Sequence, residues 1–121
     1  MRDQMKRAAF TIAAVFVATA AHAGNYAECI LDKMPGTANA PAAFAVARSC
    51  TNEYPGQYGT VERGSRLGLF GFKDPEACII KKSRDTAQPN AALMIAAACR
   101  CIYAEPEFKG QTCGNPFAPV Q

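Results

Sequence analysis

Two segments of the chain repeat the same cysteine spacing, and this repeat limits the fold more than any other sequence feature. Residues 25–54 (NYAECILDKMPGTANAPAAFAVARSCTNEY) align without a gap with residues 74–103 (DPEACIIKKSRDTAQPNAALMIAAACRCIY). The identities include two cysteine pairs, one lysine pair and one tyrosine pair: Cys29 with Cys78, Cys50 with Cys99, Lys33 with Lys82, and Tyr54 with Tyr103. Such a repeat predicts one supersecondary unit that is used twice.

Each repeat copy is predicted to begin with a helix. Asn25 and Asp74 occupy equivalent positions and are favourable N-cap residues. Glu28 follows Asn25 at the capping-box position, and Pro75 follows Asp74 at the favoured first helical position. We therefore expect a first helix from each cap, ending near residues 35–36 in copy one and near residues 84–85 in copy two.

A second helix is predicted in each copy from its alanine content. Residues 42–53 and 91–103 are alanine-rich, and alanine has the highest intrinsic helix propensity. Each segment stops before a turn signal, Pro55-Gly56 in copy one and Pro106 after copy two. Each copy is thus predicted to be a helical hairpin.

The N-terminus has the pattern of a secretory signal peptide. Arg2, Lys6 and Arg7 precede an apolar run over residues 8–21, and Ala21-His22-Ala23 supplies a small-x-small cleavage pattern before Gly24. The run is too short for an anchor, since a membrane span needs roughly 20 residues. We therefore expect residues 1–23 to be removed, no transmembrane anchor, and one periplasmic or secreted domain over residues 24–121.

The six cysteines follow the expected signal peptide, so they are predicted to form disulfides in an oxidising compartment. An antiparallel helix pair brings the start of its first helix beside the end of its second. This geometry predicts that Cys29 pairs with Cys50, and that Cys78 pairs with Cys99. Each hairpin is too short to rely on a hydrophobic core alone, which usually needs about 40 residues, so each disulfide substitutes for core.

Cys101 and Cys113 remain after these two pairs. Successive helical residues are about 100° apart, so Cys99 and Cys101 point away from each other on the second helix. Elimination then predicts a Cys101–Cys113 disulfide. Pro106 and Gly110 allow the tail to turn back, so that Cys113 can reach Cys101. Intermolecular pairing of these two cysteines would satisfy the same count, and a C-x-C redox pair or metal site is the functional alternative.

The fold class predicted from these observations is all-α. We expect two tandem disulfide-stapled hairpins, about four helices in total, packed as one small domain. Its parts are repeat one at residues 25–54, a glycine-rich linker at 56–73, repeat two at 74–103 and a tail at 104–121.

The stretches ECILDKMPG…AFAVARSC and EACIIKKSRDT…IAAACRCIY resemble a family of small exported bacterial proteins with four cysteines, described as uncharacterised. The likeness covers both repeat copies and is most specific from Cys78 to Tyr103. Cys101 and Cys113 exceed the four-cysteine pattern. The resemblance implies no activity.

The linker carries the candidate contact surface. Its glycines favour a loop with little regular structure, yet the run RLGLFGF is too apolar for a solvated linker. One interpretation places these side chains in a core shared by the hairpins. The functional interpretation is that these side chains are exposed and, together with neighbouring basic residues, form a patch that contacts a partner. The candidate residues are Arg63, Arg66, Leu69, Phe70, Phe72 and Lys73.

Composition excludes several classes of function. Removal of residues 1–23 takes three basic residues and one acidic residue, so the formal net charge falls from +3 to +1, too little for a nucleic-acid binder. It also removes His22, which is the one histidine of the sequence. The remaining residues therefore exclude catalysis by a histidine side chain and a zinc site with histidine ligands. Glu105 and Glu107 flank Pro106 in a turn and are expected to be exposed rather than catalytic.

The sequence therefore predicts an exported protein that is not an enzyme and uses no cofactor or metal. We expect a protein-interaction module with an unknown protein partner. The alternative is a peripheral binder of anionic envelope surface, because a basic cluster beside apolar aromatics can rest on a membrane.

Overall fold

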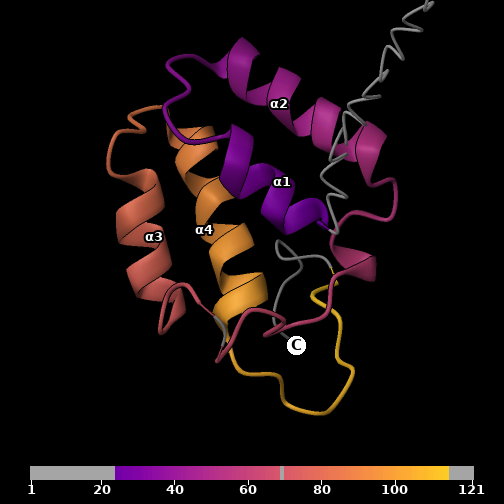
Figure 1. Cartoon of the computed structure of the whole chain (residues 1–121). Coiled ribbons are helices and arrows are strands. Elements are labelled where there is room, and N and C mark those ends of the chain that lie inside the picture. Colours follow the sequence, from indigo (N-terminus) through magenta and orange to yellow (C-terminus); the bar gives the residue numbers. More distant parts are fainter. Residues whose placement is uncertain (1–23, 69, 115–121) are drawn as a thin grey trace, which may run out of the picture.

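A computed structural model describes residues 24–68 and 70–114 of the chain. Its elements are four α-helices and one short 3₁₀-helix: α1 Tyr26–Lys33, α2 Ala40–Glu53, η1 Gln57–Thr60, α3 Pro75–Ser83 and α4 Pro89–Tyr103. Helix α4 contacts all three of the other α-helices, and α1 also packs on α2 (Figure 1). The fold is therefore all-α, as predicted, with two stapled hairpins.

The first helix of each copy begins at the predicted cap. The Asn25 side chain accepts a 3.0 Å hydrogen bond from the Glu28 backbone N–H, and the Glu28 carboxylate accepts one of 3.2 Å from the Asn25 N–H. The Asp74 carboxylate accepts a 2.8 Å bond from the Ala77 N–H. These bonds satisfy N–H groups that a helix start leaves without partners, so the N-terminal boundaries of α1 and α3 are confirmed.

The second helices begin two residues earlier than the alanine content predicted. Asn39 caps α2 by accepting a 2.9 Å hydrogen bond from the Ala42 N–H, and Gln88 caps α4 with a 2.8 Å bond from the Ala91 N–H. A proline follows in the first turn of each helix, where its missing N–H costs nothing. Helix propensity marks a helix interior, whereas these caps and prolines set the starts.

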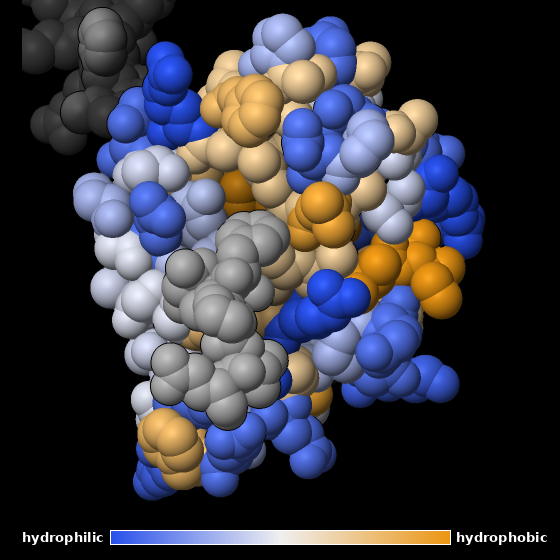
Figure 2. All heavy atoms as spheres, turned by 180° about the vertical axis from the view of Figure 1, so that it is seen from behind, coloured by the Kyte–Doolittle hydropathy of each residue, from blue (hydrophilic) through white to orange (hydrophobic). Residues whose placement is uncertain are grey.

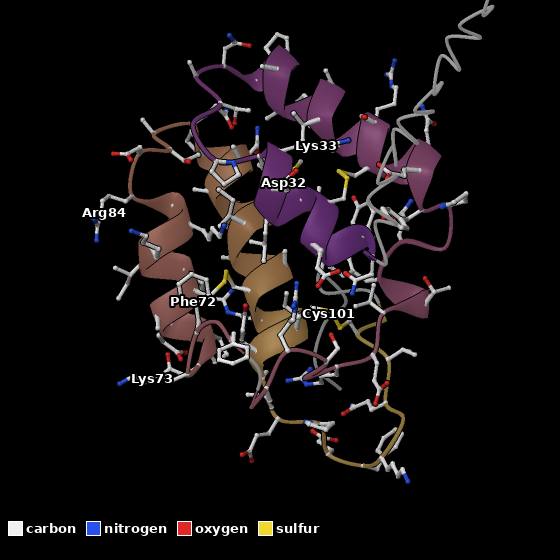
Figure 3. All side chains as sticks on the ribbon, viewed as in Figure 1. Asp32, Lys33, Phe72, Lys73, Arg84 and Cys101 are labelled. Atoms are coloured by element: carbon white, nitrogen blue, oxygen red, sulfur yellow. A yellow bond between two sulfur atoms is a disulfide. The ribbon has the colours of Figure 1, made fainter. Side chains whose placement is uncertain are left out.

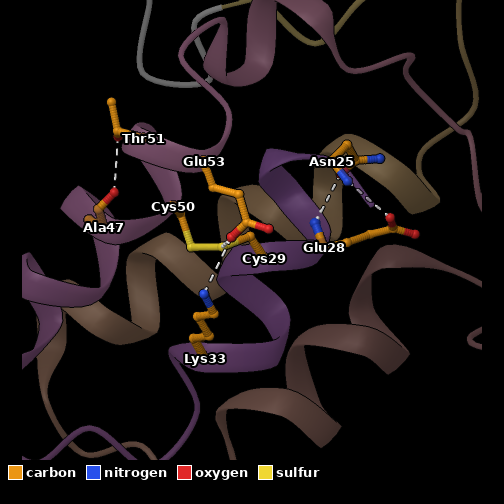
Figure 4. The surroundings of a disulfide bond; sticks show 8 residues. All are labelled: Asn25, Glu28, Cys29, Lys33, Ala47, Cys50, Thr51 and Glu53. Atoms are coloured by element: carbon orange, nitrogen blue, oxygen red, sulfur yellow. Dashed lines mark hydrogen bonds and ion pairs between the residues drawn. A yellow bond between two sulfur atoms is a disulfide. The ribbon is translucent and has the colours of Figure 1, made fainter. Parts of the chain in front are cut away.

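Both predicted staples are present. Cys29 is bonded to Cys50 and Cys78 to Cys99, each with a sequence separation of 21 and a Cα–Cα distance of 5.7 Å. The Cys29–Cys50 disulfide joins the first half of α1 to the C-terminal part of α2 (Figure 4), and Cys78–Cys99 joins the equivalent parts of α3 and α4. Because the equivalent bonds have equal separation and span, the repeat predicted the pairing correctly.

The core is built around α4. Ile95, Ala98 and Ile102 on this helix are at most 1% exposed, and Ile30 of α1 and its C-cap residue Met34 are equally buried. The two outer helices bury much less, because α2 contributes Ala43 and Cys50 and α3 contributes Cys78. The fully buried core therefore lies mainly between α1 and α4, while α2 and α3 pack against it with partly buried side chains and are each also tied by a disulfide.

The two copies use equivalent faces differently. Ala98 and Ile102 of α4 correspond to Ser49 and Glu53 of α2 in the repeat alignment. The first two are buried and the second two are exposed. The face through which α4 buries side chains is therefore polar in α2. For this reason α2 does not take the central position in the core that α4 has.

The linker caps the C-terminal end of α4. The N–H groups of Gly64 and Arg66 donate 2.9 Å hydrogen bonds to the carbonyls of Cys101 and Ile102, which a helix end leaves without partners. Gly64 has φ +73°, and a Cβ there would lie 2.8 Å from the Ala104 carbonyl oxygen. A glycine is required because the chain must approach this backbone closely. The predicted loop is thus held at a defined position.

The tail is tied to the same linker. The structure joins Cys101 to Cys113 with a Cα–Cα distance of 5.4 Å. The Cys113 N–H donates a 2.9 Å bond to the Val61 carbonyl, and the Arg63 N–H donates a 2.8 Å bond to the Gln111 carbonyl. All six cysteines are in intrachain disulfides, so in this structure none is a free thiol or a metal ligand.

The burial of Tyr58 predicts a pH-dependent stability. Its ring is 6% exposed and lies edge-on to Tyr26, with the centroids 4.8 Å apart. Burial raises the pKa of Tyr58 above its ordinary value, because the phenolate would lose its hydration, and the nearby Tyr26 adds to the effect. The unfolded chain therefore ionises at lower pH than the folded one.

This difference predicts the sign of alkaline destabilisation. The contribution from Tyr58 is fully present below pH about 10, the unfolded pKa, and is lost as the pH rises toward the higher folded pKa. Urea unfolding at about pH 9 and about pH 11 should show a fall in unfolding free energy, and Tyr58→Phe should remove part of that fall. An unchanged fall in Tyr58→Phe would contradict the assignment.

Candidate functional site

An open cleft of about 600 Å³ follows α1 and is the candidate site of the described residues. Its volume lies within the range of about 300–1,000 Å³ that is typical of small-ligand sites. The lining comes from all four α-helices or their ends, from the linker and from the residue that precedes the cap of α1. It consists of Gly24, Glu28, Cys29, Leu31, Asp32, Lys33, Glu53, Tyr54, Arg66, Phe72, Lys82, Ile102 and Tyr103.

Two ion pairs stand in this cleft. Lys33 Nζ lies 3.4 Å from Glu53 Oε2, beside the Cys29–Cys50 disulfide (Figure 4). Arg66 pairs through Nε with the Glu28 carboxylate, which also belongs to the capping box of α1. Arg66, one of the candidate contact residues, is tied to α1 by this pair, and its side chain remains 42% exposed.

Tyr54 forms one end of the cleft. A Cβ at Gly24 would lie 3.0 Å from Tyr54 Oη and 3.5 Å from Glu28 Oε2, so these groups cluster closely. Desolvation raises the pKa of Tyr54 above its ordinary value, and the charges of Glu53 and Glu28 raise it further. The phenol is therefore a neutral hydroxyl over the physiological pH range, able to donate a hydrogen bond.

Phe72 forms part of the cleft wall from the linker. Its ring packs edge-on against Tyr103, with centroids 5.4 Å apart and an interplanar angle of 83°. It packs against the buried core and points between α3 and α4 (Figure 3). For Phe72, the interpretation that linker side chains complete a shared core is correct.

For Phe70, the same interpretation is wrong. Its side chain is fully exposed, at 104% of the accessible area of a reference phenylalanine, although Phe72 two residues later packs against the core. Gly68 and Gly71 have positive φ values on either side. A Cβ at Gly71 would lie 2.8 Å from Tyr103 Oη, so the backbone is pressed against that ring and Phe70 is left outside. An apolar run can thus divide between core and surface at a turn.

The remaining candidate contact residues do not form one basic face. Arg63 is partly buried, and its Nε donates a 3.3 Å hydrogen bond to the Glu105 carbonyl. Lys73 is exposed and points outward (Figure 3). Leu69 lies outside the described residues. Among the described candidates, Phe70 and Lys73 are exposed, whereas Arg63 and Arg66 are partly buried and make contacts within the fold.

Large exposed apolar side chains occur on several elements besides the linker. They are Phe44 on α2, Ile80 on α3, Leu93 on α4 and Phe108 in the tail. On the face seen in Figure 2, apolar surface lies between hydrophilic side chains at its edges. Scattered exposed apolar residues are normal on soluble proteins, so these positions need no separate function.

Residues 24–68 and 70–114 lack two specific features. This part of the chain has no group of three or more potential metal-ligating side chains. No helix within it has the length and hydropathy needed to cross a membrane. Glu105 and Glu107 are both exposed, as predicted.

Sequence reasoning missed the cleft, although the repeat contained a signal for it. Lys33 and Lys82 are equivalent in the two copies, as are Tyr54 and Tyr103, and all four line the cleft. Comparison of the chain with family models, with curated proteins and with solved structures found no match. The site must therefore be interpreted from its own residues.

Proposed function

We propose that this protein is an exported, non-catalytic protein-interaction module that uses Phe70 as its anchor. The observation that supports this most directly is the contrast between Phe70 and its surroundings. The side chain is fully exposed, while Gly64, Arg66 and Phe72 hold the same linker to α4 and the core. An exposed aromatic side chain is a common energetic centre of a protein interface.

Export is part of the proposal. It rests on the signal-peptide pattern of residues 1–23, which lie outside the described residues, and on removal after Ala23. Three disulfides in a small domain support it, because such bonds persist in oxidising compartments. The resemblance to small exported four-cysteine proteins points the same way.

A protein partner is favoured over an anionic membrane surface by the charges around the linker. Arg66 is paired with Glu28, whereas Arg63 keeps its charge while donating to a backbone carbonyl, and Lys73 is exposed near Phe70 in the linker. Attraction of a peripheral protein to anionic lipid is worth about 1 kcal/mol per basic residue near the surface. Two linker cations without an ion pair among the described residues, Arg63 and Lys73, and one exposed ring provide little membrane affinity.

The test is a quantitative capture from envelope extract, followed by binding to the purified captured species. Phe70→Ala should weaken that binding by about tenfold or more, as expected for an interface anchor. Phe108→Ala is the matched control, because Phe108 is another exposed phenylalanine at 62% exposure on the tail. It should bind as wild type.

Binding to anionic vesicles tests the membrane alternative in the same experiment. We expect wild-type protein to bind them negligibly at physiological ionic strength. Strong vesicle binding that Phe70→Ala or Lys73→Glu abolishes would reject the protein-interaction proposal in favour of the membrane alternative. Equal capture by wild type and Phe70→Ala would reject Phe70 as the anchor.

A further inference from the structure

Lys33 and Lys82 occupy equivalent positions but have different surroundings. Each follows the first cysteine of its staple by one helical turn, at the end of α1 and of α3. In copy one, Glu53 stands one turn after the second cysteine, and its carboxylate lies 3.4 Å from Lys33 Nζ. In copy two, the position of Glu53 is taken by Ile102, which carries no charge.

Lys82 consequently lacks the partner that its counterpart has. The ion pairs found among residues 24–68 and 70–114 are Lys33–Glu53 and Arg66–Glu28, so no described carboxylate is paired with Lys82. The side chain is partly buried and lines the cleft. Asp32 also lines the cleft but is exposed on α1. A partly desolvated ammonium without a counterion attracts an anion more strongly than one in bulk water.

The cleft that Lys82 lines also has an apolar part. Ile102 and Leu31 are 1% and 6% exposed, and the edge-on pair of Phe72 and Tyr103 adds an aromatic wall. Such surfaces contribute to binding by removing apolar ligand area from water. A ligand that fits both features has one anionic end and one apolar body.

We propose that the cleft binds a small monocarboxylate that carries an apolar chain or ring. Its carboxylate pairs with Lys82 as Glu53 pairs with Lys33, while its apolar part lies against Phe72 and the apolar wall beside it. Copy one supplies this carboxylate from its own chain, whereas copy two has Ile102 at the equivalent position and leaves Lys82 to pair with a ligand. This inference goes beyond the proposed function and does not rest on Phe70.

The test uses octanoate as the probe, titrated into the oxidised protein from residue 24 onward and followed by calorimetry and by NMR shifts of the cleft residues. We expect a Kd below about 1 mM, and Lys82→Met should weaken it by about tenfold or more. Lys81→Met is the matched control, because Lys81 is the exposed neighbour on the same helix. It should leave the Kd unchanged.

Two further measurements separate the charge from the apolar contact. Octanamide has nearly the same size and no charge, so it should bind about tenfold more weakly than octanoate. Ile102→Glu should place a carboxylate beside Lys82 and abolish octanoate binding in a folded protein. If that variant does not fold, the Lys82→Met variant and the octanamide titration still test the proposal. Equal binding of octanoate by Lys82→Met and wild type, equal affinity for octanamide, or no detectable binding would overturn the proposal.

Discussion

Replacing Cys29 and Cys50 together by alanine is expected to release α2 from the rest of the fold. The disulfide closes a loop with a sequence separation of 21, and removing such a link costs about 3 kcal/mol. Helix α2 buries Ala43 and Cys50, so few apolar contacts replace the lost bond. Hydrogen exchange of α2 amides should become about 100-fold faster, while amides of α4 should change much less.

The matched control removes a disulfide at another place. Replacing Cys101 and Cys113 by alanine frees the tail from the end of α4 and should leave exchange in α2 unchanged. Unaltered protection of α2 in the Cys29/Cys50 variant would show that its packing on α1 and α4 suffices. Equal acceleration in every helix would show one cooperative unit instead of a stapled outer helix.

Replacing Phe72 by alanine is expected to lower the free energy of unfolding by about 2 kcal/mol. Truncation of a fully buried phenylalanine costs about 3–5 kcal/mol, and the smaller figure applies because Phe72 is only partly buried. The loss includes its edge-on contact with Tyr103. Urea unfolding of the oxidised protein measures it, and the midpoint should shift without a change in slope.

Phe70→Ala is the control for this substitution. The two positions share one residue type and one linker, yet Phe70 is fully exposed, so its truncation should change stability by less than about 0.5 kcal/mol. A large loss of stability in Phe70→Ala, or none in Phe72→Ala, would contradict the division of the linker between surface and core.

The candidate site was less predictable than the fold. The linker residues were recognised as important from their composition, but composition alone does not show that Arg66 meets Glu28 or that Gly71 lies against Tyr103. These contacts join segments distant in sequence, and they depend on how the hairpins pack. The sequence indicated the cleft lining only indirectly. The lysine and tyrosine that occur at equivalent positions in both copies all line the cleft.

The sequence by itself determined the local structure and the two staples. The caps at Asn25 and Asp74 act through hydrogen bonds to residues three positions away, so their effect is independent of the rest of the fold. The staples follow from the equal cysteine spacing, because a helical hairpin of either copy brings the same two positions together.

Only the tertiary structure decided how the two copies differ. Ile102 and Glu53 are equivalent in the repeat, yet one is buried in the core around α4 and the other is exposed and paired with Lys33. Which helix becomes central depends on the fit of side chains across the whole domain, and the spacing within one copy carries no such information. The same long-range packing buries Phe72, exposes Phe70 and leaves Lys82 at the cleft without a carboxylate from the described chain.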